Sequence, residues 1–220
     1  MTAILAGHDH SSIRRRVPSA PMPATDTAAY ADRLDEVQGA WWKRFAPNPY
    51  RWFLRRRHLG FTLDVGCGVG RGLDYLRGDA VGIDHNPEAV RRCRQRGFTA
   101  FTPEEFASSP FATAGRFDAL LSAHVIEHLG TDAAVALLRT YLPYVRAGGR
   151  VLLITPQERG FASDATHVTF IDDTALARLC TDAGLLVRSR RSFPLPRRAG
   201  RWFVYNEFIV EASVPAGVRA

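Results

Sequence analysis

The chain has 220 residues, 46% of them hydrophobic and 23% charged, as is typical of a soluble globular protein. This composition excludes a collagen-like repeat, a disulfide scaffold and a wholly disordered chain. No apolar run reaches the ~18 residues that a membrane helix needs. The net charge is +7, and all but one of the basic residues are arginine, the exception being Lys43. A positive field of this kind favours anionic partners.

The N-terminal stretch, residues 1–26, is rich in Ser, Pro, Ala and Thr and shows no helical or strand periodicity. We therefore expect a disordered tail. It has no basic segment ahead of its short apolar run, so it makes a poor signal peptide. With only three cysteines the chain has no disulfide framework, and these features together predict a cytoplasmic protein.

A helical cap is expected over residues 27–60. Apolar side chains recur at helical spacing between Tyr30 and Trp42. Asn48 followed by Pro49 is typical of an N-cap and first residue of a second helix, which should end before Gly60. Tryptophan and arginine are interspersed through this segment, so the cap packs against the following domain, covers a substrate pocket or contacts a lipid surface.

From residue 61 onward, short apolar segments alternate with helical patterns, and the alternation predicts a doubly wound parallel sheet. The last two strands read as a hairpin, so the seventh strand should be antiparallel. We expect a single α/β domain over residues 61–214, with a seven-stranded, mostly parallel sheet of the Rossmann-like kind. The expected strands cover residues 61–65, 80–84, 98–102, 117–123, 150–156, 185–193 and 203–214, and the expected helices cover 71–77, 87–97, 133–145 and 172–184.

A glycine-rich turn follows the first expected strand, from Asp64 to Gly70. Ligands of open α/β sheets bind at such carboxyl ends of strands. The dinucleotide fingerprint Gly-x-Gly-x-x-Gly fails at Arg71. The carboxylate of Asp64 would repel a pyrophosphate but suits the sulfonium and ammonium groups of S-adenosylmethionine. Asp84 ends the next strand about 20 residues later, where an acid can bind ribose hydroxyls.

Four motifs in this order resemble the class I S-adenosylmethionine-dependent methyltransferases: LDVGCGVG, GIDHNPEAV, FDALLSAHVIEHL and GGRVLLITP. The resemblance spans residues 61 to about 210 and implies the methyltransferase fold and S-adenosylmethionine as cofactor. The adenine contact is open between Thr102 and Glu104. The residues that the resemblance assigns to the cofactor are Asp64, Gly66, Cys67, Gly68, Gly70, Asp84, His85, Asn86, Thr102, Ser122 and Ala123.

The candidate catalytic residues follow the fourth and fifth strands. His124, Glu127 and His128 would share one face if their segment is helical, and His167 should approach the same pocket. One interpretation makes His124 or His167 a general base, with Glu127 beside them. A second makes all four residues ligands of a divalent metal. The arrangement resembles the Glu-x-x-Glu-His motif of small-RNA 2′-O-methyltransferases, with His124 in place of the first Glu. A third interpretation is purely structural.

The function we expect is methyl transfer from S-adenosylmethionine to a hydroxyl group of a small molecule, glycan or glycolipid. One alternative is an RNA ribose 2′-O-methyltransferase with a metal-assisted mechanism, although the sequence shows no separate RNA-binding module. Another is a module that binds the cofactor without catalysis. Nucleic acid is the less favoured partner, and a peripheral membrane contact is expected only through the cap.

Overall fold

The computed structural model describes residues 49–216. The tail expected at residues 1–26 and the part of the cap expected at residues 27–48 lie outside the described residues. The second cap helix is confirmed as α2 (Pro49–Arg56). Within residues 49–216, no helix combines the length and apolar character needed to cross a bilayer.

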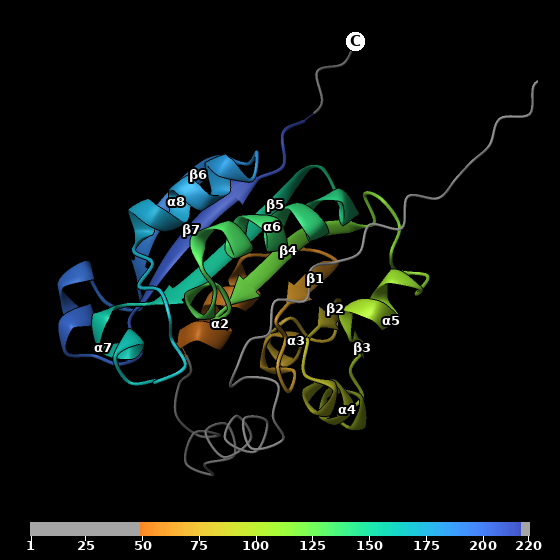
Figure 1. The fold of residues 1–220 in the computed structure, drawn as a ribbon, viewed down its shortest axis with the longest axis horizontal. Helices are drawn as coiled ribbons and strands as arrows, with labels where there is room; N and C mark the ends of the chain where they lie inside the picture. The colour runs from red at the N-terminus through yellow and green to blue at the C-terminus, as the bar shows by residue number, and fades with distance from the viewer. Residues whose placement is uncertain (1–48, 217–220) are drawn as a thin grey trace, which may run out of the picture.

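Seven strands form one sheet in the order β3-β2-β1-β4-β5-β7-β6 (Figure 1). Strands β1 to β5 run parallel, and β7 is inserted antiparallel between β5 and β6. The doubly wound α/β fold expected from the sequence is confirmed, including the terminal hairpin. The strands are β1 (Thr62–Val65), β2 (Ala80–Ile83), β3 (Ala100–Phe101), β4 (Phe117–Ala123), β5 (Val145–Pro156), β6 (Leu186–Phe193) and β7 (Glu207–Ser213).

Three of the described α-helices, α4, α5 and α8, begin at a residue whose side chain caps them. Asn86 accepts hydrogen bonds from the backbone N–H groups of Glu88 and Ala89 at the start of α4, and Asp172 plays the same part for α8. The expected helices appear as α3 (Arg71–Tyr75), α4 (Pro87–Gln95), α6 (Thr131–Tyr141), continued by η3 (Leu142–Tyr144), and α8 (Asp173–Asp182). Four short helices had not been expected: α5 (Pro103–Ala107), η2 (Ile126–His128), α7 (Glu158–Phe161) and η4 (Arg197–Arg201).

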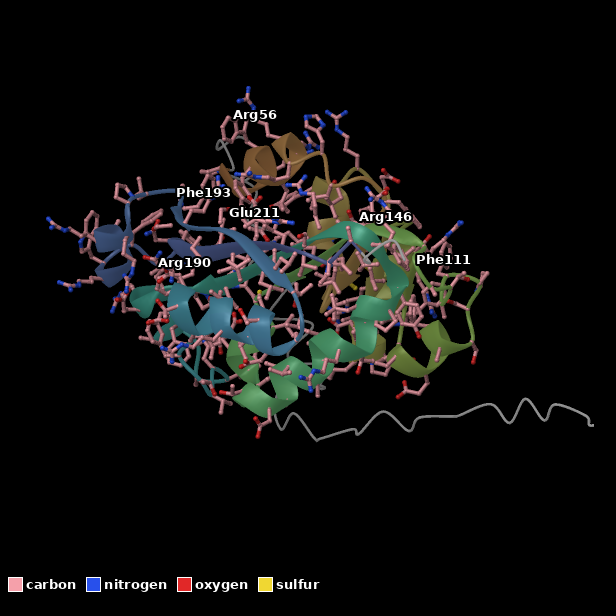
Figure 2. The ribbon with its side chains drawn as sticks, turned by 90° about the horizontal axis from the view of Figure 1, so that it is seen from above. Arg56, Phe111, Arg146, Arg190, Phe193 and Glu211 are labelled. Carbon is pink, nitrogen blue, oxygen red and sulfur yellow. The ribbon has the colours of Figure 1, made fainter. Side chains whose placement is uncertain are left out.

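Both faces of the sheet are covered. The larger core lies between the sheet and α5, α6 and α8, and smaller cores lie under α2 and under α3 and α4. Figure 2 shows α2 on one side, with Phe193 and Glu211 beneath it, and Arg190 turned toward α8 on the other. Phe53 of α2 packs against Phe193 of β6 with ring centroids 4.8 Å apart, and it shares a core with residues of β4, β5 and β7.

Two local expectations were wrong. β7 begins at Glu207 rather than at residue 203, because the chain before it turns: the Phe203 N–H donates to the Ala199 carbonyl at 2.8 Å, and the Asn206 N–H donates to the Phe203 carbonyl at 3.2 Å. Residues 126–128 form a single 3₁₀ turn that does not include His124, so the shared helical face considered for residues 124, 127 and 128 does not form. His124 has a φ of 60°, a left-handed conformation, so the chain leaves β4 sharply before that turn.

Candidate active site at the carboxyl ends of the strands

The glycine turn packs tightly between β2 and the segment that follows β4. The N–H groups of Gly66 and Cys67 both donate to the carbonyl of Ile83, at 2.7 and 3.0 Å. Gly66 has a φ of 81°, and a Cβ placed on it would collide with the side chain of Val125. The absence of a side chain at Gly66 therefore lets the glycine turn lie directly against Val125, the residue that follows His124.

Asp64 lies at the end of β1 with 3% of its surface exposed. Its Oδ2 atom is buried and has no hydrogen-bond partner among the described residues. Burial and the neighbouring Asp84 carboxylate outweigh the attraction of Arg71 and raise the pKa of Asp64 to about 7. An orphaned buried carboxylate of this kind is costly unless a cation pairs with it, so Asp64 fits the ammonium group of S-adenosylmethionine.

Asp84 is held in a defined orientation at the end of β2. Its Oδ2 accepts the Gly68 N–H at 2.8 Å and its Oδ1 accepts the Asn86 N–H at 2.9 Å. The exposed His85 lies beside it, with Nδ1 3.5 Å from Oδ1. These contacts present the carboxylate beside Asp64 at the same edge of the sheet, where it fits the ribose of the cofactor.

The other residues assigned to the cofactor divide into two groups. Cys67 and Gly70 turn toward Cys93 of α4, and Thr102 caps α5 by accepting the Glu105 N–H at 3.3 Å, so all three have structural contacts. Ser122 and Ala123, by contrast, end β4 at the site, and the buried Ser122 hydroxyl has no hydrogen-bond partner among the described residues.

His124 is held between two carboxylates. Its Nε2 lies 2.8 Å from Oε1 of Glu207, and its Nδ1 lies 3.3 Å from Oε1 of Glu127. Burial lowers the pKa of His124, but the charges of Glu207 and Glu127 reverse this effect and raise it to about 9. At neutral pH the ring is therefore an imidazolium with both nitrogens engaged, and it offers no lone pair to a substrate proton.

A second cluster joins Glu127, His128 and His167. Glu127 is fully buried, and neither of its carboxylate oxygens accepts a hydrogen bond from the described residues. Nδ1 of His124 and Nε2 of His167 nevertheless lie 3.3 and 3.9 Å from its Oε1. Nδ1 of His128 lies 3.0 Å from the Thr166 carbonyl, and Nδ1 of His167 lies 2.7 Å from the Phe161 carbonyl. A carbonyl only accepts, so both Nδ1 atoms carry the hydrogen and the basic lone pairs are on Nε2.

The three side chains of this cluster fit a divalent cation. Each offers one ligand atom, and these atoms lie within 4.8 Å of one another. Metal-binding histidines commonly donate their other ring N–H to a carbonyl, as His128 and His167 do. His124, the fourth residue of the expected ligand set, belongs instead to the ion pair with Glu207. The structure thus gives a three-residue cluster and, joined to it through Glu127, an ion pair between His124 and Glu207.

Sequence reasoning missed two residues of the site, Glu207 and Tyr50. Tyr50 comes from α2, and its hydroxyl is buried without a hydrogen-bond partner among the described residues. Burial, followed by the charge of Glu207, raises the pKa of Tyr50 well above its usual value, and Arg71 and Asp64 act on it as well. Tyr50 thus lies between the cofactor end and the Glu207 end of the site. Neither residue is part of a sequence motif, and the only signal for Glu207 is that it and Glu211 are charged residues on one face of an otherwise mostly apolar strand.

Comparisons with known proteins agree with this geometry. Residues 63–153 match the family model described as a methyltransferase domain. Over 92 residues the chain is 38% identical to the tRNA (carboxymethyluridine(34)-5-O)-methyltransferase alkbh8 of Xenopus tropicalis, covering 41% of this chain. The chain spans 14% of the length of that relative.

Solved structures share the fold. A methyltransferase from Archaeoglobus fulgidus, described as S-adenosylmethionine-dependent, aligns with a TM-score of 0.63 and 17% identity, over 84% of this chain and 99% of that one. The magnesium protoporphyrin IX methyltransferase of Synechocystis PCC 6803, with S-adenosylhomocysteine bound, aligns with a TM-score of 0.53 and 16% identity, over 84% and 98% of the two chains. Residues 63–153 therefore match a methyltransferase domain, and the chain shares its fold with solved methyltransferase structures.

Proposed function

We propose that this protein transfers a methyl group from S-adenosylmethionine to an oxygen atom, on a hydroxyl of a small molecule or glycan. The observation that carries the proposal is the pairing of two features at one edge of the sheet. These are the orphaned carboxylate of Asp64 at the cofactor end and the His124–Glu207 pair at the acceptor end. The alkbh8 relative is named as a 5-O-methyltransferase, so its own methylation is at an oxygen.

The chain's own residues divide the work of such a reaction. When bound, S-adenosylmethionine supplies a methyl group attached to a good leaving group, a neutral thioether. Asp64 would pair with the ammonium group and Asp84 with the ribose. The Glu207 carboxylate would take the proton that the acceptor hydroxyl loses when its oxygen receives the methyl group in exchange for the thioether. His124, fixed as an imidazolium, orients that carboxylate and is a positioning residue.

A metal-assisted reaction on a ribose hydroxyl of RNA is the second candidate. It is favoured by the cluster of Glu127, His128 and His167. It is also favoured by the alkbh8 relative, which is named as a tRNA methyltransferase. A donor set of two imidazoles and one carboxylate suits Zn²⁺, Mn²⁺ or Fe²⁺ better than Mg²⁺. Bound in the cluster, such an ion would supply a Lewis acid to polarise the acceptor hydroxyl.

The metal cluster leads to a direct prediction. Purified wild-type protein should bind close to one equivalent of Zn²⁺ or Mn²⁺, and Glu127→Gln should lose it because the anionic ligand is gone. Metal content by mass spectrometry and the rise in Tm on adding the ion measure the effect without any turnover. Glu104→Gln, on the exposed surface, is the control and should behave as wild type. A wild-type protein without bound metal and without any metal-induced rise in Tm would contradict the prediction.

The acceptor is tested by methylation with isotope-labelled S-adenosylmethionine. Hydroxylated small molecules and glycans are offered in parallel with total tRNA, and the products are located by mass spectrometry. We expect label on a hydroxyl of a small molecule or glycan. Label on tRNA, with a steep dependence on salt, would transfer the function to the second candidate. Micromolar binding of S-adenosylhomocysteine with no product from any acceptor would favour a module that binds the cofactor without catalysis.

We also propose that the protein works in the cytoplasm. Cys67, Cys93 and Cys180 are free and buried, which suits a reducing compartment.

A further inference from the structure

A compact lobe projects beside the site, built from residues 157–170 and 194–206. It contains α7 and η4, which lie next to each other at one end of the sheet (Figure 1). Gly160 of α7 approaches the Val204 carbonyl so closely that a Cβ there would lie 2.6 Å from the oxygen. The Asn206 amide donates to Oε1 of the buried Gln157 at 2.9 Å. These contacts make the lobe a firm platform rather than a loose loop.

The lobe exposes an unusual amount of apolar surface. Of the eight large hydrophobic residues that are exposed in the described part of the chain, five belong to the lobe, although it contains a small share of the residues. The exposed fractions are 69% for Trp202, 69% for Val168, 60% for Tyr205, 41% for Phe170 and 38% for Leu195. A concentration of this kind on a small projection marks an interaction surface.

The charge of the same surface is positive. Arg159, Arg198 and Arg201 are exposed on α7 and η4. The acid on α7, Glu158, is already paired with Arg197 at 2.8 Å. The lobe therefore presents an excess of arginine around its exposed aromatic and aliphatic side chains, and its occupant must combine negative charge with an apolar interior.

We propose that this lobe docks on the surface of a membrane that contains anionic lipids. Tryptophan, tyrosine and arginine, with apolar bodies and polar ends, are suited to the boundary between headgroups and hydrocarbon. Val168 and Leu195 favour a lipid surface over a nucleic acid, because aliphatic side chains gain contact with acyl chains but cannot stack on bases as aromatic rings do. Arginine near an anionic surface adds electrostatic attraction that salt weakens.

One segment of the lobe directly follows the end of β5, and the other directly precedes β7, whose first residue is Glu207. Docking would therefore bring the acceptor edge of the site close to the lipid surface. That consequence rests on the proposed function, whereas the binding to lipid does not.

The experiment is vesicle flotation with the full-length protein at low and high salt. Vesicles of phosphatidylcholine with one-third phosphatidylglycerol are compared with vesicles of phosphatidylcholine alone. Wild type should bind the anionic vesicles and lose binding at high salt. Trp202→Ser should weaken the partition about tenfold. Arg198→Ala with Arg201→Ala should weaken it about 25-fold, since each basic residue near the surface contributes about a fivefold factor.

Trp52→Ser is the matched control, because Trp52 is 56% exposed on α2, outside the lobe. It should float like wild type. Binding of S-adenosylhomocysteine, measured on each variant, should stay unchanged, so that a failure of lipid binding is distinguished from a failure of the methyltransferase domain. No flotation of wild type would overturn the proposal. Preferential binding of tRNA that Trp202→Ser abolishes would overturn it in favour of a nucleic-acid surface.

Discussion

Replacing Asp64 with asparagine should weaken binding of S-adenosylmethionine about hundredfold, because the substitution removes the buried charge that pairs with the ligand's ammonium group. The same substitution should make the unliganded protein more stable. Both effects have one cause: a carboxylate kept in a buried position without a partner is unfavourable until the cation arrives. Isothermal titration gives the Kd, and chemical denaturation gives the free energy of unfolding.

The sign of the stability effect follows from the pKa of Asp64. It is about 7 in the folded protein against 3.8 for an ordinary aspartate, and the difference of about 3 pKa units corresponds to about 4 kcal/mol. The folded state holds the proton more tightly, so stability falls as pH rises from 4 to 7. An asparagine leaves a buried amide unpaired, at a cost of about 1–3 kcal/mol, so the net gain at pH 8 should be about 2 kcal/mol. The gain should shrink as the pH falls toward 4.

Ligand binding should depend on pH in the opposite sense. Because the cation binds the charged carboxylate, affinity should rise from pH 6 to pH 8, and a proton should be released on binding below pH 7. Asp118→Asn is the control: Asp118 lies at the far end of β4, bonds to the Phe61 N–H and Arg146, and has a lowered pKa. It should lose stability and keep its affinity. Unchanged affinity in Asp64→Asn would remove Asp64 from the binding site.

Replacing Glu207 with glutamine should lower kcat by about 10²- to 10⁴-fold on the confirmed acceptor, because the group that takes the proton is lost. The Kd for S-adenosylhomocysteine should change little, since Glu207 faces the acceptor end. Steady-state kinetics and cofactor titration on the same preparation separate the two effects. A KM change alone, with kcat intact, would assign Glu207 to acceptor binding and contradict its role in proton transfer.

Glu211→Gln is the matched control for this experiment. Glu211 lies on the same strand and the same face as Glu207, but it pairs with Arg57 at 2.8 Å, away from the cofactor turn. It should leave kcat within about twofold, as expected when a substitution does not touch the reacting groups. A similar loss of kcat in both variants would point to general disturbance of β7 rather than to chemistry at Glu207.

The main outline of the fold could be predicted from the sequence because it depends on local patterns of apolar and capping residues. Alternating apolar strands and capped helices specify β1 to β5 and their crossovers. The structure confirms these elements, with boundaries shifted by a few residues. The short helices α7 and η4 were missed because no periodicity marks them. They are held by tertiary contacts, such as the buried pairing of Gln157 with Asn206. The late start of β7 was missed for the same reason as these helices, because no periodicity marks the turns that precede it.

The cofactor half of the site was determined by the sequence itself, since Asp64, the glycine turn and Asp84 follow directly from strand ends that the pattern defines. Only the tertiary structure decided the acceptor half. A positive φ at His124 and the insertion of β7 beside β5 bring Glu207, 83 residues away, to the imidazole. This contact has no local signature in the sequence, because sheet topology sets it. It makes His124, which was expected to act as a base, a cation held between two carboxylates.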